Sequence, residues 1–136
     1  MALDYVSTEN AIHAKIESSS HSGIKEGYVV GLNSSGETVL ACAGSGANVE
    51  AFGFAQIDGT YGSTDQTLNR TTEDHLMQGR MGGFSGLTPG LTVYVSTTAG
   101  GVTQTKPTGA GEFAQKVGGA YTSTNIVIKI GTPIYV

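Results

Sequence analysis

Apolar and polar residues alternate over several short segments of the chain, which is the pattern of β-strands buried on one face. In the stretch TVYVS, residues 92–96, the two valines fall on one face. Proline and glycine at positions 89–90 and a small-residue run at 99–101 flank this stretch, and both are typical of turns. Because residues 102–106 resume an extended pattern, we predict a β-hairpin that spans residues 92–106.

The same order of elements occurs earlier, where a strand, a polar turn and a returning strand fill residues 27–41. A strand with a central glycine follows each hairpin, at Gly53 in the first half and at Gly118 in the second. Gly27 and Gly90 lie about 63 positions apart, and the two central glycines about 65 apart. We interpret this spacing as a degenerate internal duplication, with a chance recurrence of common β-turn patterns as the alternative.

Two facing hairpin units predict an all-β fold, either a small β-barrel or a sandwich. Further strands are expected over residues 12–16 and 126–130, a bent strand over 76–86, and a short edge strand at 134–136 after a proline. We assign residues 1–10 to an extended N-terminal arm and 11–136 to a single β domain, in which 59–76 form a long polar loop. The expected core residues are Val29, Val39, Phe54, Val93, Val95, Val117, Ile126, Ile128 and Ile130.

Composition and charge narrow the possible partners. The chain has 136 residues, of which 13% are charged, with a net charge of -4. Its seven basic residues form no cluster along the sequence, which argues against nucleic acid as a partner. No apolar run approaches the roughly 20 residues that span a bilayer, and residues 1–10 lack the features of a secretory signal. We therefore expect a soluble protein made in the cytoplasm, without a membrane partner, whose Cys42 is a buried structural thiol.

Candidate chemical groups are few and scattered. His13, His21 and His75 do not have the spacing of a metal site, so we expect neither a metal nor another cofactor. The segment 73–75, Glu-Asp-His, could orient a general base, but an exposed loop is the better interpretation. Two glycine-rich runs, at 44–47 and 79–86, lack the Lys-Ser or Lys-Thr pair of a phosphate loop. We therefore predict no enzyme activity and no small-molecule substrate.

The segment LTPGLTVYVSTTAGGVTQTKP and its continuation through residue 131 resemble a segment that recurs in virion proteins of tailed phages. That segment occurs in head-decoration (capsid cement) proteins and in head or tail fibres. It reads L-x-P-G-x-x-x-Y-[LV]-S-x-x-x-G-G-[ILV]-T, then a turn with proline, a V-G-x-A strand and an alternating apolar strand. Residues 27–58 are similar to the small decoration proteins more specifically, so the resemblance covers about two-thirds of the chain.

The resemblance implies a structural virion protein that binds the outer surface of the phage head and stabilises contacts between major capsid protein subunits. It also implies self-association, with a trimer favoured. An extended arm can add to the sheet edge of a partner, so the expected interface comprises Ala2, Leu3, Asp4, Tyr5 and Val6. The alternative function is a head or tail fibre module for host or carbohydrate recognition, with a contact loop that includes Tyr61, Asn69 and Arg70.

Overall fold

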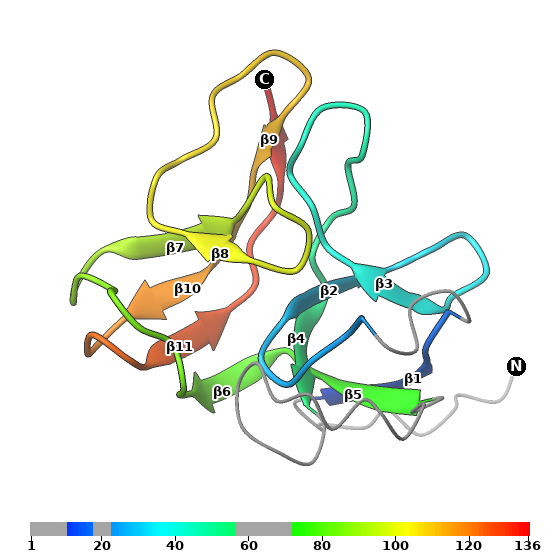
Figure 1. Cartoon of the computed structure of the whole chain (residues 1–136), viewed down its shortest axis with the longest axis horizontal. Coiled ribbons are helices and arrows are strands. Elements are labelled where there is room, and N and C mark those ends of the chain that lie inside the picture. Colours follow the sequence, from blue (N-terminus) through cyan, green and yellow to red (C-terminus); the bar gives the residue numbers. More distant parts are fainter. Residues whose placement is uncertain (1–10, 18–22, 57–71) are drawn as a thin grey trace, which may run out of the picture.

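The computed structural model describes residues 11–17, 23–56 and 72–136, and these residues form short antiparallel strands without any helix (Figure 1). The all-β prediction is therefore confirmed. Ten of the strands lie in two five-stranded sheets, and the remaining two form a small separate sheet.

The first sheet contains the strands of the N-terminal half in the order β1-β5-β4-β2-β3. These strands are β1 (Ala11–Lys15), β2 (Val29–Leu32), β3 (Thr38–Leu40), β4 (Gly53–Gln56) and β5 (Thr72–Leu76). Asn33 stabilises the turn between β2 and β3, because its side-chain oxygen accepts hydrogen bonds from the backbone N–H groups of Ser35 and Glu37, each at 2.9 Å. An isolated bridge between Ile16 and Thr38 joins the two outer strands at one point.

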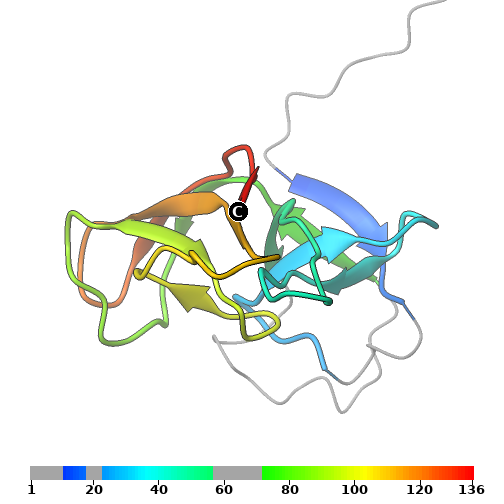
Figure 2. The same ribbon diagram turned by 90° about the horizontal axis from the view of Figure 1, so that it is seen from above.

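The second sheet repeats this arrangement in the order β6-β11-β10-β7-β8. Its strands are β6 (Gln78–Met81), β7 (Thr92–Val95), β8 (Val102–Thr103), β10 (Lys116–Ala120) and β11 (Ile126–Lys129). The remaining strands, β9 (Phe113–Ala114) and β12 (Ile134–Tyr135), pair with each other. Figures 1 and 2 show the two large sheets beside each other, with the C-terminus between them in the view from above.

The two large sheets are equivalent strand by strand: β1 corresponds to β6, β2 to β7, β3 to β8, β4 to β10 and β5 to β11. We call β1–β5 the first half-unit, and β6, β7, β8, β10 and β11 the second half-unit. The correspondence extends to individual hydrogen bonds: the N–H of Gly27 donates to Ala55 at 2.9 Å, and the N–H of Gly90 donates to Ala120 at 2.7 Å. Both glycines have a positive φ, 84° and 86°, which favours glycine at this turn. The repeat predicted from the glycine spacing is thus present in the strand topology.

The core lies between the two sheets, which is compatible with sandwich-like packing. Its main cluster combines buried residues of both half-units with residues of the small sheet: Val29, Ala41, Ala43, Ala51, Phe54, Met81, Phe84, Val93, Val95, Phe113, Val117, Ala120, Ile126 and Ile128. A second cluster contains Ile16, Ile24, Val30 and Ala55. Since the adjacent residues Val29 and Val30 belong to different clusters, the first sheet buries apolar groups on both faces.

Most predicted core residues are buried, and two differ. Val39 is only half-buried, whereas Thr38 is buried on the other face of β3, which Leu40 shares with Val30 of the second cluster. Ile130 is also half-buried and packs against the edge of the main cluster. The predicted loop 59–76 is wrong at its C-terminal end, since Thr72–Leu76 form β5. This strand is poor in apolar residues, and its pairing with both β1 and β4 stabilises it.

Candidate interaction surface

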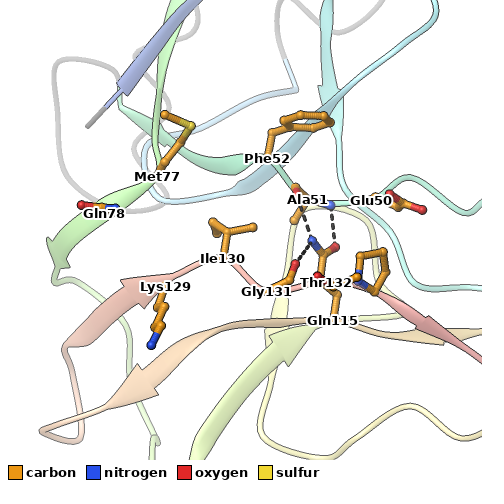
Figure 3. Close-up of a pocket in the computed structure, with 11 residues that line it drawn as sticks. Glu50, Ala51, Phe52, Met77, Gln78, Gln115, Lys129, Ile130, Gly131 and Thr132 are labelled. Atoms are coloured by element: carbon orange, nitrogen blue, oxygen red, sulfur yellow. Dashed lines mark hydrogen bonds between the residues drawn. The ribbon is translucent and has the colours of Figure 1, made fainter. Parts of the chain in front are cut away.

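A groove of about 710 Å³ opens where the two half-units meet. Its walls come from three segments that are distant in the sequence: residues 50–52 before β4, 77–78 at the junction of β5 and β6, and 129–133 from the last residue of β11 onward. Figure 3 shows these segments around the opening, with Gln115 reaching toward Ala51 and Gly131. The groove therefore depends on how the half-units pack together.

Gln115 joins two walls of the groove from a position that is 2% exposed. Its side-chain oxygen accepts a hydrogen bond from the N–H of Ala51 at 2.7 Å. Its amide nitrogen donates to the carbonyl oxygens of Ala51 and Gly131, both at 2.9 Å. Because a buried amide with these partners is restricted to one orientation, Gln115 holds the segments before β4 and after β11 at a fixed separation.

The segment before β4 is also held by close backbone packing against Gly31 of β2. A Cβ atom at position 31 would overlap the carbonyl oxygen of Glu50 and lie 2.8 Å from a methyl group of Val49. Only glycine allows the two backbones to approach this closely. The wall that carries Glu50 and Phe52 is therefore built on the first half-unit.

Tyr135 of β12 connects the C-terminal strand to this wall. Its hydroxyl donates a hydrogen bond of 2.6 Å to a carboxylate oxygen of Glu50, and its ring packs against Phe113 with centroids 5.3 Å apart. The hydrogen bond to Glu50 is the main reason that the pKa of Tyr135 is raised, with smaller contributions from burial and from the negative charge of Glu50. Ionisation of the phenol would remove this link.

One exposed apolar side chain, Phe52, lines the groove, and three more follow the groove residue Pro133 along the chain. Phe52 is 44% exposed and lines both the groove and a second, smaller hollow that includes Tyr135. Ile134 and Val136, on either side of Tyr135, are more exposed still. We call Phe52, Ile134, Tyr135 and Val136 the apolar rim. Exposed apolar groups gathered beside a hollow are typical of a surface that binds another macromolecule.

The predicted interface residues lie outside the described residues. This applies to the arm, Ala2, Leu3, Asp4, Tyr5 and Val6, and to the alternative contact residues Tyr61, Asn69 and Arg70. The groove was not predicted from the sequence, although an edge strand at 134–136 was. The local signal at Phe52 is its large apolar side chain directly before β4, whereas nothing local distinguishes Gln115.

The polar cluster at 73–75 was predicted to be an exposed loop, and this is wrong because it belongs to β5. In the pairing of β1 with β5, Asp74 stands opposite His13 and His75 stands opposite Ile12. His21 is not among the described residues. Within the parts of the chain that the structure describes, no group of three His, Cys, Asp or Glu side chains is arranged to hold a metal ion.

Cys42 is buried, as predicted, and its thiol contacts the carbonyl oxygen of Thr97 at 3.3 Å. A transmembrane helix is not found among the described residues. Comparison with known protein families and with curated protein sequences finds no match for this chain. What the described residues offer is a groove with two ionisable side chains, Glu50 and Lys129, and an apolar rim. This arrangement is suited to binding an apolar surface or segment.

Proposed function

We propose that this protein is a structural virion protein that decorates the head of a tailed phage. In this role it binds the outer surface of the head and stabilises contacts between major capsid protein subunits. Its contribution is binding rather than catalysis, and it acts in many copies on the assembled shell, after synthesis in the host cytoplasm.

The resemblance to decoration proteins supports this proposal because of where its two segments fall in the fold. Residues 27–58 contain β2, β3 and β4 of the first half-unit, and residues 86–131 contain β7, β8, β10 and β11 of the second. Each segment therefore supplies the hairpin of a half-unit and the strand that pairs with it. The similarity follows structural units and is not confined to isolated turns.

The observation that carries the proposal is the apolar rim on a rigid support. Phe52 and Tyr135 are exposed, yet both belong to segments anchored by buried contacts, through Ala51 to Gln115 and through the Phe113 ring. A pre-ordered surface loses little conformational entropy on binding. When many copies bind one shell, even a modest free energy per copy adds to the stability of the assembled particle.

The test uses purified protein and empty phage shells, with bound copies per shell measured by sedimentation as protein concentration rises. We expect saturation at a fixed number of copies and a higher melting temperature of the decorated shell. Phe52→Ser should reduce the apparent affinity at least tenfold, about 1.4 kcal/mol. The matched control is Leu91→Ser, since Leu91 is 51% exposed but does not line the groove.

The fibre hypothesis predicts a different outcome of the same experiment. A host-recognition module would bind host cells or their surface glycans and would leave the empty shell undecorated. Binding to cells without saturable shell binding would therefore contradict the decoration proposal. If Phe52→Ser and Leu91→Ser reduced the affinity for shells equally, the apolar rim would not be the contact surface.

A further inference from the structure

The outer face of the second sheet gathers basic residues that lie far apart in the sequence. Residues 75–136 contain four basic residues and one acidic residue, a net charge of +3, although the whole chain carries -4. Arg80 of β6, Lys129 of β11 and Lys116 of β10 are exposed, and the five strands of this sheet contain no acidic residue. Lys116 pairs with Tyr94, whose two neighbours on β7 are buried, so both face outward.

Strand pairing determines which side chains are neighbours on this face. Val127 is 45% exposed and stands between Arg80 and Gly119, which pair with it from the two adjacent strands. Lys129 follows two positions along β11 and therefore points to the same side as Val127. An exposed apolar side chain thus lies among cations. We call Arg80, Lys116, Val127 and Lys129 the basic face.

Gly119 leaves a notch beside Val127. It does not have a positive φ, and a Cβ atom at position 119 would meet nothing nearer than the backbone oxygen of Leu91, at 3.9 Å. Gly118 differs, because a Cβ atom there would overlap the carbonyl oxygen of Val127. The fold therefore requires glycine at 118 but accepts a side chain at 119. A glycine within a strand often marks a place where a ligand or another backbone approaches closely.

We propose that the basic face binds an acidic protein surface of the phage head, which covers Val127 with an apolar side chain. This inference rests on the proposed function and names the chemistry of the shell surface that the protein recognises. Three exposed cations on strands without a carboxylate select an acidic partner by charge complementarity. Val127 and the notch at Gly119 select a protein over an anionic polysaccharide, because hydrated sulfate or carboxylate groups would leave the apolar centre uncovered.

The basic face is continuous with the groove. Gln78 and Lys129 belong to the second sheet and also line the groove (Figure 3). One partner can therefore contact the basic face and the apolar rim together, and the charges would contribute chiefly to orientation and to the rate of association. The overall charge of -4 does not prevent this contact. At physiological ionic strength the Debye length is about 8 Å, so charges that face each other outweigh those on the far side of the molecule.

The first experiment measures binding of the full chain to empty phage shells by sedimentation. We expect the affinity to be lower at about 1 M salt than at about 0.1 M, because the Debye length falls from about 10 Å to about 3 Å. At the lower salt, Arg80→Glu/Lys116→Glu should reduce the affinity about tenfold or more, since two attractions become repulsions. Neither residue lines the groove. The control, Lys15→Glu/Lys106→Glu, makes the same change in net charge at exposed lysines off the basic face and should bind like the unmodified chain.

Filling the notch tests the apolar centre without changing charge. Gly119→Thr should leave the melting temperature unchanged or raise it, because a β-branched residue suits a strand and the position has room for a Cβ atom. It should nevertheless weaken shell binding, since the partner can no longer approach Val127. Shell binding equal to that of the unmodified chain would place the contact elsewhere and overturn the proposal.

The second experiment needs no shells, so it separates this inference from the proposed function. Poly-L-glutamate is titrated into the isotopically labelled chain, and amide shifts are followed by NMR. We expect shifts at Gly119 and Val127 that Arg80→Glu/Lys116→Glu abolishes. If these shifts occur but shells stay undecorated, the proposed function fails and the acidic-protein preference of the face stands. The inference is overturned if poly-L-glutamate leaves these amides unshifted, if only heparin shifts them, or if both double variants bind shells equally well.

Discussion

Replacing Gln115 by leucine tests whether the two walls of the groove are held together by one buried amide. Leucine has a similar volume, so Gln115→Leu removes hydrogen bonds without opening a large cavity. The N–H and carbonyl of Ala51 then lose their partner in a position that is almost fully buried. The carbonyl of Gly131 is more exposed and can be hydrated instead.

The expected loss of stability follows from these groups. Leaving one buried donor or acceptor unsatisfied costs about 1–3 kcal/mol, so the two groups of Ala51 together cost about 2–6 kcal/mol. For a domain of this size each kcal/mol shifts the melting temperature by roughly 3–5 °C. We therefore expect Gln115→Leu to lower the melting temperature by roughly 6–30 °C, measured by differential scanning calorimetry.

The chain contains a matched control in Gln104. Its amide makes the same three kinds of contact: it accepts from the N–H of Thr88 at 2.8 Å and donates to the carbonyls of Thr88 and Leu91 at 3.0 and 3.4 Å. These contacts are exposed, so water can replace the glutamine, and Gln104→Leu should cost less than about 1 kcal/mol. The reasoning is refuted if the two variants lose similar stability, or if Gln115→Leu melts like the unmodified protein.

Three further predictions concern the core, the arm and the C-terminal tyrosine. Ile128→Ala should lower the free energy of unfolding by about 2–5 kcal/mol in a denaturant titration, because this side chain is 3% exposed. An equal decrease for Val127→Ala, at the neighbouring outward position, would show that the assigned orientation of the strand is wrong. Deleting residues 2–8 should leave the melting curve nearly unchanged and reduce shell occupancy at least tenfold, whereas unfolding of the isolated domain would place the arm in the core. The phenol of Tyr135 should titrate above the ordinary tyrosine pKa of about 10. The hydrogen bond to Glu50 should therefore stabilise the fold fully below pH 10, and this stabilisation should be lost as the pH rises through the raised pKa of Tyr135. Absorbance titration should show a smaller shift in Glu50→Gln, and an unchanged shift would exclude the carboxylate as its cause.

Much of the fold could be predicted from the sequence because it depends on short-range patterns. Alternation over residues 92–96 and 126–130 determines which side chains face inward, and both strands lie where the pattern indicated. The glycines at 27 and 90 mark equivalent turns, and their spacing predicted the repeat. The alternation did not indicate that Thr38 is more buried than Val39, because both are β-branched residues that favour a strand and the first sheet buries side chains on both faces.

Local patterns could not predict the strand at 72–76 or the groove. The strand TEDHL is poor in apolar residues, and it exists because β1 and β4 on its two sides pair with its backbone. The groove combines residues 50–52, 77–78 and 129–133, which meet only when the half-units pack, and its buried link between Gln115 and Ala51 spans 64 positions. The sequence alone determined the periodicity, the turns and the unequal division of charge. Only the tertiary structure decided which exposed groups share a surface, because that depends on contacts between residues far apart in the chain.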